Sequence, residues 1–230
     1  MTNFESNLKN RKEAFEKLFP IPGVAADLGC GTGVDSIALA SNGHSVYGFD
    51  PSPLMLEAAI ANSAKHSKGI EYVESNILSI PLKFNSQFDF AISLGNTFAN
   101  VEGTTIYSTV QRLYDILKTG GKCLIHILNY ELIWEQKERI VSIKPDQENY
   151  FVRFYDFING QINFNILRFS KNDTSNYSFL TTQVYSYKKD LLVKVFSSVG
   201  FTNINLFSNF GMEPFDITKD KDLYLLCEKK

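Results

Sequence analysis

The first half of the chain alternates short apolar runs with stretches whose apolar residues recur at helical spacing. Runs of nearly continuous apolar character are typical of strands that are buried on both faces. The predicted strands cover residues 24–28, 45–50, 70–74, 88–93 and 122–128. The predicted helices cover residues 11–19, 35–40, 53–65 and 106–118. Regular strand–helix alternation indicates a doubly wound, mostly parallel sheet of the α/β class, with helices on both faces.

Local signals bound several of these elements. Pro20 follows the first helix, and Ser52 with Pro53 forms a good start for the third. Gly120-Gly121 is expected to end the fourth helix. Ligands on such sheets bind beyond the carboxyl ends of the strands, so the residues that follow each strand are the ones to inspect.

The pattern changes after Leu128. Residues 130–137 predict a short helix, and residues 139–187 show β-type alternation without a long helix. Runs at 150–157 and 161–169 flank Asn159-Gly160, a strong hairpin signal, and a third run covers 179–187. The pattern then predicts a helix at 189–199 and strands at 203–207 and 223–227. We therefore expect a core over 1–130, an inserted antiparallel cap over 131–187, and a segment over 188–230 that completes the core sheet.

The composition indicates the broad class of protein to which the chain belongs. Of the 230 residues, 44% are apolar and 21% charged, and the formal net charge is −2, as in ordinary globular proteins. The absence of a basic block argues against a nucleic-acid partner. The apolar runs are too short for a membrane span, and no signal-peptide pattern opens the chain, so we expect a cytoplasmic protein without a membrane partner.

The cysteines and histidines predict no metal site. Cys30, Cys123 and Cys227 form no metal-binding spacing, and the three histidines are scattered. We expect Cys123 and Cys227 to be buried thiols, and His126 to be a buried, hydrogen-bonded side chain rather than a base.

A glycine-rich loop carries the first chemical signal. Asp27-x-Gly29-x-Gly31-x-Gly33 lies between a predicted strand and a predicted helix, where glycine lets the backbone approach a ligand closely. A nicotinamide-type fingerprint would need glycine at the position of Val34. Asp50 ends the neighbouring strand, where an acidic side chain can accept hydrogen bonds from ribose hydroxyls. The alternatives are a tight turn without a ligand and a charge at the start of the next helix.

With these residues in place, the first half resembles a class I S-adenosylmethionine (SAM)-dependent methyltransferase. That resemblance implies a seven-stranded Rossmann-like fold, SAM as cofactor and S-adenosylhomocysteine as product. It places the methionine part of SAM at the glycine loop, the ribose at Asp50 and the adenine amine near Asn76, where the family usually has an acid. The cofactor-binding residues it implies are Asp27, Gly29, Cys30, Gly31, Gly33, Asp50, Pro51, Asn76, Ile77 and Leu94.

The acceptor side resembles glycine N-methyltransferase and its small-molecule relatives. Ser93-Leu94-Gly95-Asn96-Thr97-Phe98 matches their segment after the fourth strand, and Asn129-Tyr130 matches their pair after the fifth. The resemblance implies catalytic roles for Asn96 and Tyr130. Those enzymes place an arginine where this chain has Leu128, so we expect that glycine is not the substrate.

The sequence therefore predicts methyl transfer to a small molecule, most simply at an amine nitrogen. The substrate-binding candidates are Asn96, Tyr130, Trp134, Arg153, Tyr155, Arg168, Tyr185 and Tyr187. Aromatic residues at alternating strand positions are also typical of a core, and the arginines also suit a solvated strand. Transfer to a carboxylate or phenol oxygen, a protein or peptide acceptor, and a non-catalytic SAM-binding module remain open alternatives. The sequence does not decide between a monomer and a homodimer.

Overall fold

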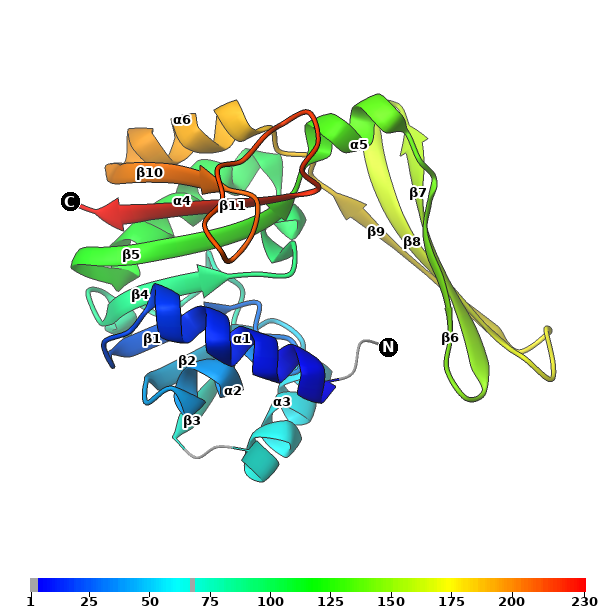
Figure 1. Ribbon diagram of the computed structural model, residues 1–230, viewed down its shortest axis with the longest axis horizontal. Helices are drawn as coiled ribbons and strands as arrows, with labels where there is room; N and C mark the ends of the chain where they lie inside the picture. Colours follow the sequence, from blue (N-terminus) through cyan, green and yellow to red (C-terminus); the bar gives the residue numbers. More distant parts are fainter. Residues whose placement is uncertain (1–3, 67–68) are drawn as a thin grey trace.

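The computed structural model describes residues 4–66 and 69–230 and contains a seven-stranded sheet in the order β10-β11-β5-β4-β1-β2-β3 (Figure 1). Strand β11 runs antiparallel to both of its neighbours, and the other pairs are parallel. The predicted doubly wound fold is confirmed. The strands are β1 Val24–Leu28, β2 Ser45–Asp50, β3 Ile70–Glu74, β4 Phe88–Ser93, β5 Leu117–Leu128, β10 Phe201–Phe207 and β11 Asp222–Lys229.

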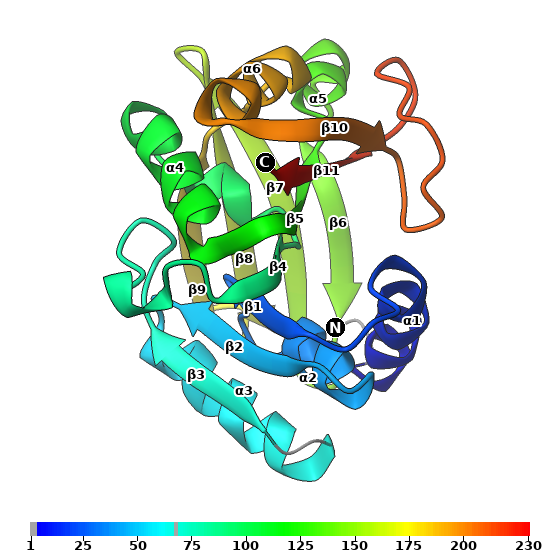
Figure 2. The same ribbon diagram turned by 90° about the vertical axis from the view of Figure 1, so that its left-hand side faces the viewer.

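Two apolar layers hold the helices against this sheet, one on each face (Figure 2). One layer joins α1 and α2 to the sheet through side chains such as Phe15 and Ile37, and the other joins α4 and α6 through Leu113 and Phe196. These four side chains are fully buried, which gives each helix a strong hydrophobic anchor. The helices are α1 Phe4–Leu18, α2 Val34–Ser41, α3 Pro53–His66, α4 Ile106–Ile116, α5 Tyr130–Gln136 and α6 Lys189–Val199.

A second, antiparallel sheet projects from the core in the order β6-β7-β8-β9 (Figure 1). Asn159 and Gly160 both have positive φ, 51° and 76°, and join β7 to β8 in the predicted tight hairpin. The backbone N–H of Tyr185 donates to the carbonyl of Ala99 at 2.7 Å and so ties the end of β9 to the core. The strands are β6 Ile140–Pro145, β7 Asn149–Ile158, β8 Gln161–Ser170 and β9 Tyr177–Val184.

Several predicted boundaries are wrong, and β5 begins at Leu117 rather than at residue 122. Helix α4 ends at Ile116 rather than at the glycine pair, because Leu117 already has extended backbone angles and pairs with Phe88. Gly120, with φ 76°, instead lies in an irregular part of β5, between Leu117 and Lys122, where the pairing with β4 shifts register. Helix α1 begins at Phe4, and β9 ends at Val184.

Candidate functional site

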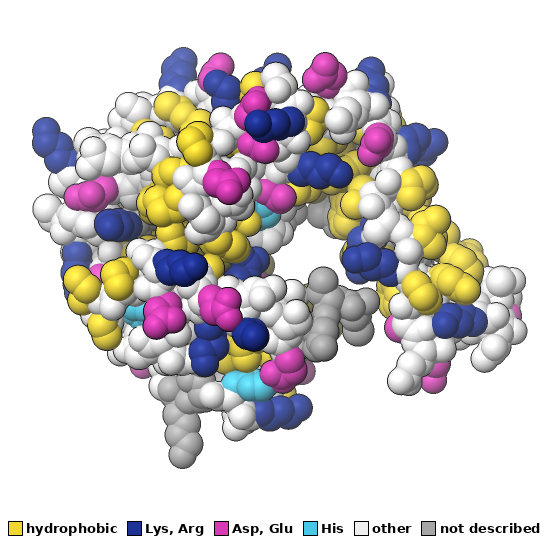
Figure 3. All heavy atoms as spheres, viewed as in Figure 1, with side chains coloured by type: hydrophobic (Ala, Val, Ile, Leu, Met, Phe, Trp, Pro, Cys, Tyr) yellow, Lys and Arg dark blue, Asp and Glu magenta, His cyan; other side chains and the backbone are white. Residues whose placement is uncertain are grey.

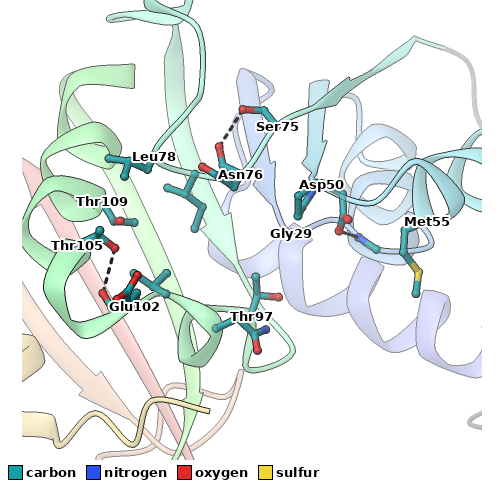
Figure 4. Close-up of a pocket in the computed structure, with 15 residues that line it drawn as sticks. Gly29, Asp50, Met55, Ser75, Asn76, Leu78, Thr97, Glu102, Thr105 and Thr109 are labelled. Carbon is teal, nitrogen blue, oxygen red and sulfur yellow. Dashed lines mark hydrogen bonds between the residues drawn. The ribbon is translucent and has the colours of Figure 1, made fainter. Parts of the chain in front are cut away.

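A cavity of about 630 Å³ lies where the loops after β1, β2, β3 and β4 meet (Figure 4). We call it the first cavity. Its walls come from four loops and the start of α4, so segments far apart in the sequence build one site. Its lining residues are Gly29, Gly31, Asp50, Pro51, Met55, Ser75, Asn76, Ile77, Leu78, Thr97, Asn100, Val101, Glu102, Thr105 and Thr109.

The glycine loop after β1 has three glycines with positive φ, which makes a chain reversal without side chains. A Cβ at Gly29 would clash with the side chain of Thr97, which belongs to the loop after β4. A Cβ at Gly31 would meet nothing within 4 Å and would enter open space beside the first cavity. Gly29 therefore serves the packing of two loops, whereas Gly31 leaves room for a ligand.

This difference predicts that Gly29→Ala lowers stability more than Gly31→Ala. Both positions have positive φ, but only the first substitution also creates an overlap, which typically costs about 1–3 kcal/mol. In a chain of this size we expect a melting temperature at least about 2 °C lower for Gly29→Ala than for Gly31→Ala, measured by differential scanning fluorimetry. Equal melting temperatures would show that Thr97 does not pack against the loop as described.

Asp50 is a buried acid whose carboxylate holds the glycine loop. Its Oδ2 accepts the backbone N–H of Gly31 and its Oδ1 accepts that of Ser52, both at 2.9 Å. A carboxylate offers about four acceptor sites, so each oxygen keeps one for a ligand hydroxyl. The side chain lines the first cavity beside Met55 (Figure 4), which gives it both a structural contact and free acceptor capacity.

Asn76 lies in the same cavity, after β3. Its side-chain Oδ1 accepts the backbone N–H of Ser79 at 2.9 Å, and its carbonyl accepts the hydroxyl of Ser75 (Figure 4). The amide oxygen retains one lone pair for an amine donor. Ile77 is buried and lines the cavity next to it.

Asp27 is buried behind the loop. Its Oδ2 accepts the hydroxyl of Ser36 at 2.6 Å, and burial together with the nearby Asp35 raises the pKa of Asp27 to about 8. Asp35 also has a raised pKa because it is buried, and it pairs with Arg11 at 3.0 Å. Because Arg11 stabilises the charge on Asp35, Asp27 is the carboxyl of this pair that holds a proton near neutral pH.

Three other predicted residues support the loops without lining the first cavity. Cys30, Gly33 and Leu94 are buried. A Cβ at Gly33 would press on Tyr72 and Ala59, so this glycine serves helix packing. The carbonyl of Leu94 accepts the hydroxyl of Thr97 at 2.8 Å and fixes the turn after β4.

Asn96 joins the loop after β4 to the end of β5. It has φ 65°, and its Oδ1 accepts the backbone N–H of Leu128 at 3.0 Å. Its Nδ2 donates to the hydroxyl of Tyr130 at 2.9 Å. Tyr130 is fully buried, and burial raises the pKa of its phenol, which therefore stays neutral.

Asn96 and Tyr130 line a second cavity of about 470 Å³ between the core and the antiparallel sheet. Figure 3 shows a hollow between these two parts of the molecule. Asn100 lines both the first and the second cavity, so the two cavities are neighbours at the loop after β4. The lining residues of the second cavity are Gly95, Asn96, Asn100, His126, Leu128, Tyr130, Val141, Tyr155, Phe164, Ile166, Thr182 and Val184.

His126 is buried and hydrogen-bonded, as predicted, but it also lines the second cavity. Its Nδ1 accepts the backbone N–H of Asn96 at 3.2 Å, and its Nε2 lies 2.9 Å from Oδ1 of Asp222. Both ring nitrogens are therefore engaged by protein groups. The position of His126 near the end of a core strand was the only sequence signal for a place in the site.

Of the predicted acceptor residues, the structure brings Asn96, Tyr130 and Tyr155 together and leaves five outside the second cavity. Trp134 donates through Nε1 to Ser186 at 3.1 Å, and Tyr187 donates to the carbonyl of Val101 at 2.6 Å. Tyr185 packs against the core. The arginines lie further out on β7 and β8, where Arg168 bonds to Ser178, Asn149 and Asn176.

Within residues 4–66 and 69–230, no group of three or more His, Cys, Asp or Glu side chains could hold a metal ion. No helix in these same ranges is long and apolar enough to cross a membrane.

Known proteins give matches that agree with this geometry. Residues 25–121 match a family described as a methyltransferase domain. Glycine/sarcosine N-methyltransferase of Aphanothece halophytica is 24% identical over 236 residues, covering 100% of this chain and 85% of that protein. Glycine N-methyltransferase of Oryctolagus cuniculus is 31% identical over 121 residues, 46% of this chain but only 41% of that protein's length.

Two further similarities widen the range. The 18S rRNA (guanine-N(7))-methyltransferase of Bos taurus is 29% identical over 129 residues, 53% of this chain and 44% of that protein. The crystal structure of a SAM-dependent methyltransferase from Clostridium acetobutylicum superimposes with a TM-score of 0.81 at 16% identity, covering 96% of this chain and 92% of the other. At that identity the likeness establishes the fold alone.

Proposed function

Because the chain belongs to the class I SAM-dependent methyltransferases, we propose that it methylates an amine nitrogen of a small molecule bound in the second cavity. The observation that carries this proposal is that the two cavities share Asn100 as a lining residue. One cavity has the acid and the glycine loop that suit SAM, and the other lies beside it under the antiparallel sheet. Methyl transfer needs such adjacent sites, because cofactor and acceptor must come into line.

The residues of the first cavity fit SAM. Gly31 leaves open space where any other residue would place a Cβ, and Asp50 retains acceptor sites for ribose hydroxyls. We propose that Asn76 and Ile77 hold the adenine and that Asp27, behind the loop, attracts the amino group. A volume of about 630 Å³ is within the range of roughly 300–1,000 Å³ that is typical of small-molecule sites.

When bound, SAM supplies a methyl group that its sulfonium has already activated. The protein's part is then to orient the acceptor and exclude water. We propose that Asn96 and Tyr130 orient the acceptor nitrogen from the wall between the cavities. The antiparallel sheet covers the second cavity through Tyr155, Phe164 and Val184.

The lack of a free base favours an amine over a phenol. A neutral amine attacks with its own lone pair, whereas a phenol must first lose a proton. His126 has both nitrogens engaged, and burial raises the phenol pKa of Tyr130 and Tyr155. The residues described around the second cavity include no Asp, Glu or Lys. We therefore expect no assisted deprotonation of a phenol there.

Three compounds with the same ring test the nature of the accepting atom. Benzylamine, phenol and benzoate would each be incubated with the purified protein and methyl-labelled SAM, and the labelled products separated by mass spectrometry. The proposal predicts label on benzylamine. Label on phenol or benzoate instead would establish O-methylation and overturn the proposed amine chemistry.

The raised pKa of Asp27 predicts that SAM binding depends on pH. A cation near Asp27 favours its charged form, so binding below pH 8 should release a proton from this carboxyl. Affinity is then expected to rise between pH 6 and 8, by at most about tenfold per pH unit, and to level off above 8. Calorimetry in buffers of different ionisation enthalpy would count the proton.

Asp27→Asn is the matched control for this prediction, because it keeps the shape of the side chain and removes its titration. The variant should bind SAM with one fewer proton released. If wild type and variant release the same number, Asp27 does not face the amino group.

A further inference from the structure

We infer that the acceptor of this chain is an amine with an apolar, ring-sized body and no carboxylate or phosphate, an inference that rests on the proposed function. The composition of the second cavity carries it. Its apolar walls are Leu128, Val141, Phe164, Ile166 and Val184, contributed by β5, β6, β8 and β9. An acceptor that fills about 470 Å³ must bury much of its surface against them.

The polar groups of the cavity suit a neutral acceptor rather than an anion. Among the described residues that line it there is no Lys or Arg. His126 accepts the N–H of Asn96 through Nδ1, and its Nε2 lies 2.9 Å from the carboxylate of Asp222. Tyr155 and Phe164 add aromatic side chains to the lining, which suit an apolar ring. An anion here would lose its hydration without gaining a charged partner.

The two arginines that were predicted for the acceptor site do not line this cavity. Arg153 lies two residues before Tyr155 on β7 and pairs in register with Ile166. Arg168 lies further out still and bonds to Ser178, Asn149 and Asn176. An acid group beside the acceptor nitrogen therefore finds neither of these arginines among the residues that line the cavity.

A third cavity, of about 170 Å³, adjoins the second and offers further space for the body of the acceptor. The two share Leu128, Val141 and Tyr155 as walls. Lys221 lines the third cavity, but Glu138 lines it too, so their formal charges cancel. The shared walls are apolar or aromatic, which suits a further apolar group on the acceptor rather than an acid.

Three probes that share a phenyl ring and an amine nitrogen test the inference. Benzylamine carries only the amine, phenylglycine adds a carboxylate beside it, and phenylglycinamide replaces that carboxylate with a neutral amide. Calorimetry on protein saturated with S-adenosylhomocysteine measures their affinities, and label transfer from SAM measures turnover. We expect phenylglycine to be at least tenfold weaker than both other probes in affinity and in kcat/KM, and glycine not to be turned over.

A substitution of Leu128, which lines both the second and the third cavity, tests the inference by changing the protein instead of the probe. Leu128→Arg introduces a cation into the second cavity, and Leu128→Met is its uncharged control. We expect Leu128→Arg to reverse the preference toward phenylglycine by at least tenfold relative to Leu128→Met.

The outcomes separate this inference from the proposed function. Phenylglycine that binds wild type as well as benzylamine does, or turnover of glycine, would overturn the inference while leaving amine methylation intact. Amines that bind but take no label would overturn the proposed function. Failure of all three probes to bind would overturn the assignment of the second cavity as the acceptor site.

Discussion

Asp50→Ala is expected to lower the affinity for SAM by about 10- to 100-fold. The carboxylate fastens the glycine loop through Gly31 and keeps acceptor sites free toward the first cavity, so alanine removes both contributions. Hydrogen bonds to a charged group are each worth about 1.5–3 kcal/mol, and 1.4 kcal/mol is a factor of ten in affinity. Calorimetric titration with SAM measures the change, with circular dichroism to confirm that the fold persists.

Glu74→Ala provides the matched control. Glu74 ends β3 and pairs in register with Asp50, but it is exposed and does not line the first cavity. The same charge is therefore removed from the same edge of the sheet, and affinity should stay within about threefold, since exposed charges contribute little. Equal losses in the two variants would indicate a general electrostatic effect rather than a binding role for Asp50.

Gly31→Val tests the same site by obstruction. The valine side chain would enter the open space beside the first cavity, at a residue with φ 52°. We expect a loss of SAM affinity of at least about tenfold in the folded variant, comparable to that of Asp50→Ala. Unchanged affinity would refute the placement of the cofactor against this loop.

Asn96→Ala is expected to lower kcat with benzylamine by about 100-fold while the dissociation constant for SAM changes by less than about threefold. Asn96 makes two side-chain hydrogen bonds, to Leu128 and Tyr130, at the wall between the cavities. Alanine removes both hydrogen bonds, so the segments that they join can move apart. A displacement of about 1 Å near the reacting atoms can cost about 100-fold in rate. Steady-state kinetics and calorimetry on the same preparation separate the two effects.

Asn42→Ala is the control for this change. Asn42 also uses its side-chain amide, donating to the carbonyl of Lys12 at 2.9 Å, but it lies at the end of α2 and lines neither cavity. Its loss should leave kcat and SAM affinity unchanged. A wild-type kcat in Asn96→Ala would remove Asn96 from the acceptor site.

Sequence reasoning predicted the core best because its signals are local. The strands β1, β2, β3 and β4 begin and end at the predicted residues, since each is a short run rich in apolar residues that glycine or polar residues delimit. Gly120-Gly121 misled the prediction because a glycine with positive φ serves a strand irregularity as well as a helix end. Periodicity alone does not separate these two uses.

The acceptor side was less predictable because its residues meet only through long-range packing. Tyr185 and Tyr187 follow a β-type pattern, yet β9 ends before them and they pack against the core. Conversely, His126 and Thr182 enter the second cavity from strands that the chain separates by many residues. Which face of a strand points to a cavity depends on how the second sheet docks, and no local pattern records that.

A crystal structure with S-adenosylhomocysteine and benzylamine tests most directly the claim that cofactor and acceptor meet across the loop after β4. We predict that the product occupies the first cavity against Gly31 and Asp50, with its sulfur facing Asn100, which lines both cavities. The amine nitrogen should lie in the second cavity beside Asn96, in line with that sulfur. A sulfur that faces away from the second cavity, or an amine bound elsewhere, would contradict the account.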